Sequence, residues 1–327
     1  MTCDMKHQKM ALLFGNYQID TKNAKDLNLI PKDCVDSISC VRFGNDRVAF
    51  GSTNMSVVIH TKISEPNPQR FSLKIENVAI LGIEWNRWDP RLLMIVTKGK
   101  IIVVNSENNT TERELCPPND SIGFVNGLWY EEGIIGFLDK GAVEIWDNQY
   151  ELKNKFSIKG SYKCATIDNK VLYIGMERII KRYNVSEYKI DEIDEIMVTP
   201  GCVNRIQITT KWMITSDANG IIAWSKDLLI PEFSLKAKGN DLIAAPNGEI
   251  AISVIDGNNV AMSKVEDGKF NELKQVLPIS TSAESSKIAA DWYVLNENEL
   301  MCAIAFEKSD EFCYVIIAKI TKINKNV

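Results

Sequence analysis

The sequence predicts an all-β fold, and three features of its 327 residues support this prediction. Short runs of β-branched and aromatic residues alternate with turns rich in Gly, Asn and Asp, as in antiparallel hairpins. These runs recur in groups of three at a nearly constant spacing along the chain. The middle run of most groups is almost wholly apolar, which indicates a strand buried on both faces between stacked sheets.

The repeated unit consists of an apolar strand, a short turn, a second strand, a tight turn and a third strand rich in Ile and Val. In the third unit these strands are FVNGLWY, GIIGFLD and GAVEIWD. β-Propellers repeat about every 40–45 residues, one unit for each blade. The first strands of the seven units start near Ser39, Ala79, Gly123, Lys163, Val203, Asp241 and Ile288.

One dipeptide links these units to a known repeat. Trp146-Asp147 ends the third unit, and it is the dipeptide after which the WD repeat is named. The corresponding positions have changed to Trp224-Ser225 in unit five and to Asn105-Ser106 in unit two, while Trp88-Asp89 is expected to lie in a turn. The sequence therefore predicts a single domain over residues 1–327, a seven-bladed WD-repeat β-propeller.

Ring closure requires a fourth strand for the seventh unit, because an open last blade leaves an unpaired edge. The chain ends soon after the third strand of this unit, so we expect the N-terminal lead, residues 1–36, to supply the closing strand. Residues 11–14 and residues 26–30 are both candidates, and the sequence does not choose between them.

Composition and motifs exclude several classes of function. A net charge of -5 gives no overall basic field for nucleic acid, so only a local patch would make a weak RNA contact. The eight cysteines form no CxxC pair and the two histidines, His7 and His60, lie far apart, so we predict no metal, no cofactor and no disulfide. No apolar run approaches the ~20 residues of a membrane span, and we expect an intracellular, soluble protein.

Signatures of phosphate-binding loops, dinucleotide-binding turns, zinc proteases and serine hydrolases do not occur. We therefore predict that the chain is not an enzyme and has no small-molecule substrate. The acidic run from Asp191 to Glu195 is interpreted as a solvated outer strand, and the alternative is a carboxylate pair for a metal or a glycosidic bond.

A basic stripe is the candidate site for a partner. Lys181 and Arg182 fall in unit four, Arg205 in unit five, and Lys236 and Lys238 at the start of unit six. If these side chains come together, they would bind the carboxylates of a peptide through charge-assisted hydrogen bonds. The alternative is scattered surface charge.

Four stretches give the chain a family resemblance. KDLNLIPKDCVDSISCVRF resembles the entry into blade one of the RNA export factor family, the Rae/Gle-type WD propellers of the nuclear pore. SYKCATIDNKVLYIGMERIIKRYNV resembles a later blade of that family. CVNRIQI and FSLKAKG resemble its Arg-Cys strand and its Phe-Lys-Cys-His-Arg segment, and all matches fall in the same order.

The resemblance implies a non-catalytic scaffold that docks a GLEBS-type nucleoporin segment for mRNA export, in the nucleus and at the nuclear envelope as well as in the cytoplasm. By position it carries partner binding to Arg205 and Lys236, although Ile221 and Gly239 stand where two further arginines are expected. The Bub-type checkpoint propeller, which docks kinases at kinetochores, is similar and is one alternative. A WD-repeat accessory subunit of a methyltransferase or ligase complex is the other.

Overall fold

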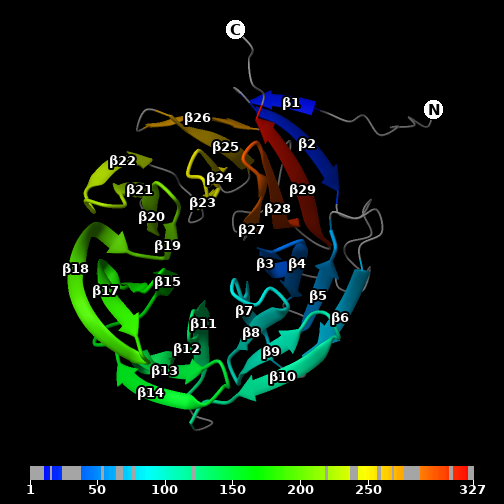
Figure 1. Cartoon of the computed structure of the whole chain (residues 1–327). Helices are drawn as coiled ribbons and strands as arrows, with labels where there is room; N and C mark the ends of the chain where they lie inside the picture. Colours follow the sequence, from blue (N-terminus) through cyan, green and yellow to red (C-terminus); the bar gives the residue numbers. More distant parts are fainter. Residues whose placement is uncertain are drawn as a thin grey trace.

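The computed structural model shows antiparallel sheets arranged around a central axis, each running outward from the axis like a blade (Figure 1). It describes residues 11–14, 17–23, 38–52, 55–63, 69–75, 78–118, 122–217, 220–235, 242–255, 259–266, 269–275, 288–308 and 312–322. The first and the last described strands of the chain belong to the same sheet. The all-β propeller that the repeats predict is confirmed.

Strands occupy four successive positions outward from the axis. The innermost are β3 (Ile38–Gly44), β7 (Ile80–Trp85), β11 (Phe124–Tyr130), β15 (Cys164–Asp168), β19 (Arg205–Ile208), β23 (Leu242–Ala244) and β27 (Ile288–Asn296). The second are β4 (Arg47–Ser52), β8 (Leu92–Thr97), β12 (Gly133–Leu138), β16 (Val171–Gly175), β20 (Trp212–Asp217), β24 (Ile250–Ile255) and β28 (Glu299–Lys308).

The third strands are β5 (Ser56–Thr61), β9 (Ile101–Asn105), β13 (Ala142–Asp147), β17 (Glu177–Ser186), β21 (Gly220–Ser225), β25 (Asn259–Glu266) and β29 (Phe312–Lys322). The fourth are β6 (Gln69–Lys74), β10 (Thr110–Leu115), β14 (Leu152–Ser157), β18 (Lys189–Cys202), β22 (Pro231–Leu235), β26 (Lys269–Gln275) and β2 (Tyr17–Asn23), with β1 (Ala11–Phe14) beyond β2. A 3-10 turn spans Asp139–Gly141.

The expectation of seven four-stranded blades needs correction. Six sheets have four strands, and the sheet that closes the ring has five, in the order β1-β2-β29-β28-β27. The strand that pairs with β29 is β2, with Ile19 opposite Ile320, so neither candidate segment closes the ring directly. Residues 11–14 form β1 on the outer side of β2, and residues 26–30 lie outside the described part of the chain. The β1–β2 hairpin was missed because YQIDTKN alternates polar and apolar residues only weakly.

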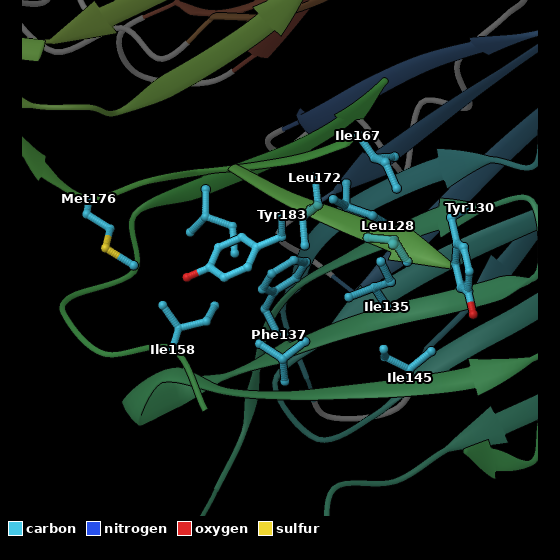
Figure 2. Close-up of a cluster of buried hydrophobic side chains, with 13 residues drawn as sticks. Leu128, Tyr130, Ile135, Phe137, Ile145, Ile158, Ile167, Leu172, Met176 and Tyr183 are labelled. Carbon is cyan, nitrogen blue, oxygen red and sulfur yellow. The ribbon is translucent and has the colours of Figure 1, made fainter. Parts of the chain in front are cut away.

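Hydrophobic cores lie between neighbouring sheets rather than at the centre of the ring. Figure 2 shows the core between the sheet of β11–β14 and the sheet of β15–β18, where Phe137 and Ile145 pack with Leu172 and Tyr183. Both faces of the second and third strands are covered in this way, and Ile134, Ile135 and Val143 have no exposed surface. Because burial of apolar area is the main favourable term in folding, stacking of sheets around the ring supplies most of the stability.

Indole side chains fasten successive innermost strands to one another. The Nε1 of Trp85 donates a hydrogen bond to the carbonyl of Arg42 in the preceding sheet at 3.1 Å. Trp129 makes the same bond to the carbonyl of Glu84 at 3.1 Å, and Trp292 to that of Ile243 at 2.9 Å. Since these three tryptophans occupy the same position in their strands, the bonds hold neighbouring innermost strands in a common register.

The outermost strands carry the features that protect a sheet edge. Lys153 on β14 and Ile193 on β18 each stand at a break in the strand register, where the ladder of hydrogen bonds is interrupted. Four acidic residues lie between Asp191 and Glu195 on β18, and all are exposed. Bulges and charges on an edge strand discourage pairing with the edge of another molecule.

We predict that Trp129→Phe destabilises the propeller by about 2 kcal/mol, because it removes both a buried hydrogen bond and part of a fully packed ring. Trp88→Phe is the matched control, since Trp88 is 42% exposed, and we expect a loss below about 1 kcal/mol. Urea unfolding followed by far-ultraviolet circular dichroism measures both. Equal midpoints for the two variants would contradict a structural role for the indole bonds.

Candidate site at the central channel and its entrance face

The innermost strands line a cavity of about 510 Å³ on the axis of the ring. Much of its wall consists of backbone and small side chains, among them Gly82, Ala165 and Ala289. Small side chains leave the centre open, so that the few long polar side chains of the wall decide what the cavity accepts. The charged side chains of the wall are Arg42 on β3, Glu84 on β7, Arg205 on β19 and Asp291 on β27.

Arg42, Glu84 and Asp291 occupy the same position in three neighbouring innermost strands. Each precedes an aromatic residue, namely Phe43, Trp85 and Trp292, that turns into the space between the sheets. Strand alternation therefore turns the three charged side chains toward the channel. Arg42 has an acidic neighbour on either side, and one of its Nη atoms donates to the carbonyl of Val41 at 2.8 Å.

The two carboxyl groups also connect blades. Oδ2 of Asp291 accepts the N–H of Phe43 in the next sheet at 2.7 Å, and Oε2 of Glu84 accepts the N–H of Trp129 at 3.4 Å. Gln207 does the same with its amide, which accepts from the N–H of Ala244 at 2.9 Å and donates to its carbonyl at 2.6 Å. Side-chain to backbone bonds thus join three pairs of neighbouring innermost strands around the channel.

Removal from water dominates the acid–base behaviour of these carboxyl groups. Burial in the channel raises the pKa of Glu84 to about 7, against the opposing effect of Arg42. Burial also raises the pKa of Asp291, again opposed by Arg42. Glu84 therefore exchanges its proton near neutral pH, which is unusual for a carboxyl group.

The structure separates the residues of the predicted basic stripe. Arg205 lines the channel at the start of β19. Lys181 and Arg182 lie farther out on β17, where Lys181 pairs with Glu192 at 3.1 Å and Arg182 pairs with Asp194 on β18. The acidic run is therefore an outer strand, as interpreted, and its carboxylates neutralise two members of the stripe. Lys236 and Lys238 lie outside the described residues.

One face of the ring surrounds the mouth of the channel, and we call it the entrance face. It comprises the first residues of the innermost strands and the turns between second and third strands. Backbone hydrogen bonds join these segments from sheet to sheet, for example from Phe124 N to Lys98 O at 2.9 Å and from Val203 N to Met176 O at 3.0 Å. Within one sheet, Lys163 N donates to Gly175 O at 3.0 Å.

Five exposed cations gather on the entrance face over the second, third and fourth sheets. No described residue forms an ion pair or side-chain hydrogen bond with any of them, while Asp139 and Glu177 are acidic neighbours in the chain. The five are Lys98, Lys140, Lys159, Lys163 and Arg178. On the opposite face, by contrast, Asp168 and Lys226 pair at 2.8 Å and Glu249 pairs with Lys211 at 3.4 Å.

Two apolar side chains are exposed beside these cations. Leu81 is 48% exposed and Val125 is 40% exposed, and each stands at a bulge in its innermost strand. Ser39 occupies the same bulge position in β3 and is also exposed. A bulge re-aims the side chain that it leaves unpaired, so three successive sheets present an unpaired residue at the mouth of the channel.

An arginine from another blade crosses the opposite end of the channel. Arg87, in the turn after β7, donates through Nη2 to the carbonyl of Ile167 on β15 at 3.3 Å. Its guanidinium lies over the ring of Trp88, 4.6 Å from the ring centroid. Trp88-Asp89 accordingly belongs to a turn, as expected from the sequence. The entrance face is thus the more open approach to the cavity.

Other expected absences concern only the described part of the chain. There, no three His, Cys, Asp or Glu side chains lie close enough to hold a metal ion, and no described helix is long and apolar enough to cross a membrane. His60 is 1% exposed at the end of β5, with its ring against Phe50. It is therefore a core residue of its blade.

The sequence analysis did not identify the channel carboxyl groups or the entrance-face cations. One signal was available for the first: Glu84 and Asp291 directly precede tryptophans that align between units, and Arg42 precedes the aligned Phe43. The cations lie in turns, where composition alone does not distinguish a surface charge that has a partner from one that does not.

Comparison with known proteins supports the fold. No protein-family model matches the sequence, and no curated protein matches it. One similar solved structure is the β-propeller domain of Cps50 (Swd1) from Myceliophteria thermophila, with a TM-score of 0.65 and 13% identity over 86% of this chain and 96% of that domain. In all, 972 chains of solved structures match, so a fold this common does not select a function. The chain is a WD-repeat-like β-propeller.

We predict that Glu84 makes the propeller less stable as pH rises. Its folded-state pKa of about 7 is above the ordinary value, so its contribution is fully present at low pH and is lost between about pH 4.5 and 7. Glu84→Gln should match the natural chain at pH 5 and exceed it at pH 8, by on the order of 2 kcal/mol.

Glu299→Gln is the control, because an exposed hydrogen bond from Lys319 lowers the pKa of Glu299. That variant should lose, not gain, stability at neutral pH relative to acid. Urea midpoints at pH 5, 6, 7 and 8 decide the question. A Glu84→Gln variant with the same pH dependence as the natural chain would show that Glu84 is ordinarily solvated.

Proposed function

We propose that this chain is a non-catalytic β-propeller scaffold that binds an acidic segment of another protein across its entrance face. The observation that carries the proposal is the group of five exposed cations without described ion partners, in a chain whose net charge is -5. A basic patch without neutralising partners attracts a complementary acidic segment and orients its approach.

The shape of the entrance face suits an extended segment. Exposed Leu81 and Val125 offer apolar contacts beside the cations, while Arg205 extends the basic character into the channel. A guanidinium can bind a carboxylate through two parallel hydrogen bonds, which a lysine ammonium cannot do. Arg205 thus remains the predicted anchor, and Lys181 and Arg182 are better explained as part of their own blade.

The channel carboxyl groups support a role without catalysis. Glu84 and Asp291 each accept a backbone N–H of the next sheet. A general acid or base must be within reach of a substrate proton, whereas these groups hold the wall together. Both groups therefore have a role in holding neighbouring sheets together.

The choice among the three partner classes is part of this proposal, and the structural likeness supports it. Similarity to the Cps50 (Swd1) propeller over 96% of that domain supports an accessory subunit of a methyltransferase or ligase complex in preference to the mRNA-export propeller or the checkpoint propeller. Under either of the latter, the chain would be found at the nuclear envelope or at kinetochores. Affinity capture followed by mass spectrometry separates the three, since a catalytic subunit, nucleoporins or checkpoint kinases would dominate.

We predict that the double variant Lys140→Gln/Lys163→Gln weakens binding of the captured partner about fivefold, because two surface charges contribute about 1 kcal/mol together. Lys170→Gln/Lys189→Gln is the matched control, with the same change of charge in turns of the opposite face. Isothermal titration at 50 and 300 mM salt measures both, and the difference should shrink at high salt. Equal affinities for the two double variants would exclude the entrance face as the surface that binds the partner.

We predict that Arg205→Ala lowers partner affinity by about 2–5 kcal/mol if its carboxylate pair is buried from water. The melting temperature of the same sample shows whether the fold is affected. Lost stability together with unchanged affinity would mean that Arg205 acts only within the ring.

A further inference from the structure

The guanidinium of Arg42 offers hydrogen-bond donors to a guest in the channel. The carboxyl groups on either side of Arg42 each already accept a backbone N–H, at 2.7 Å for Asp291 and 3.4 Å for Glu84. Arg42 donates to the carbonyl of Val41 from a guanidinium that carries five N–H groups. Thr166 and Asn204 line the same cavity and add a hydroxyl and an amide. A guanidinium favours an anionic guest, because it binds a carboxylate through charge-assisted hydrogen bonds.

We propose that the channel binds a carboxylate at Arg42, and that Glu84 takes up a proton when this carboxylate enters. In this state Arg42 pairs with the guest, and the protonated carboxyl group of Glu84 offers an O–H donor in place of a negative charge. One negative charge enters and one is neutralised by a proton from solvent, so the net charge of the wall does not change.

The charged surroundings of Glu84 make this exchange favourable near neutral pH. Arg42 from β3, Asp291 from β27 and Arg87 from its own turn are the charges that act on it, and the N–H of Trp129 from β11 donates to it. Because its pKa is about 7, the proton costs little free energy at neutral pH. Without that proton, a guest carboxylate would be the third carboxylate beside Arg42 and would face the charges of both Glu84 and Asp291.

The guest is expected to enter from the entrance face. Cations around that mouth attract carboxylates, whereas Arg87 lies across the opposite end and bonds to Ile167. The cavity of about 510 Å³ has room for one acidic side chain. If the guest is a carboxylate of the docked segment, this inference rests on the proposed function. If the guest is a free small carboxylate, the inference is independent of it.

Two probes distinguish these sources: acetylated and amidated hexaglutamate, and sodium succinate. Each is titrated into the full chain by calorimetry at pH 6, 7 and 8, in two buffers of different ionisation enthalpy, so that the protons taken up are counted directly. We expect uptake of up to one proton at pH 8, and affinity that falls by up to about tenfold per unit above pH 7. Glu84→Gln should bind both probes with no pH dependence.

The entrance-face variant Lys140→Gln/Lys163→Gln separates this proposal from the proposed function. It should weaken hexaglutamate but keep the proton uptake, because the channel is unchanged. Proton uptake with succinate alone would establish the channel site for small carboxylates and leave the docked segment without support. Two outcomes would overturn the channel site but leave binding at the entrance face supported. One is binding that weakens in the lysine variant without any proton uptake, and the other is binding that Glu84→Gln does not change.

Arg42→Gln should abolish the binding of succinate, and its far-ultraviolet spectrum shows whether it folds. If this variant does not fold, the proton count in the natural chain and the pH profile of Glu84→Gln still decide the proposal. Failure of both probes to bind at pH 6 would overturn it.

Discussion

The bonds from side chains of one innermost strand to the backbone of the next are the interaction on which the rest of the ring depends. Sheets of a propeller stack through apolar side chains, and such contacts are non-directional, so they fix neither register nor height along the axis. The indole of Trp129 and the carboxyl group of Glu84 join the same two strands in opposite directions, at 3.1 and 3.4 Å. Directional bonds of this kind set where every side chain of the channel stands.

In this wall, charged side chains are removed from bulk water and are held in place by hydrogen bonds to the backbone. Glu84 and Asp291 are held by backbone donors, and burial still raises the pKa of both. The fixed arrangement of Arg42 between two acids therefore lowers the free energy of unfolding at high pH. Positions like these, where structure and acid–base behaviour conflict, are where functional groups concentrate.

Sequence periodicity predicted the architecture well because a propeller repeats a local unit. Innermost strands begin at Ile38, Phe124 and Ile288, within two residues of the positions that the spacing gives. Closure was harder, since it pairs β2 with β29 across nearly the whole chain and no local pattern encodes that partner. Two residues of the basic stripe show the same limit, since Lys181 and Arg182 were counted without the acids of β18, which the hairpin folds onto them.

The two candidate sites differ in how tightly they are coupled to the fold. The entrance-face cations stand in turns, make no described ion pair and so can change with little effect on stability. The channel groups connect blades, so any change that alters binding there also alters the ring. If a partner binds only at the entrance face, the lysines of this face can change in sequence together with the partner. A carboxylate site at Arg42, by contrast, depends on the same hydrogen bonds that hold neighbouring blades together. Selection on the ring would then preserve the channel chemistry even as the surface around it drifts.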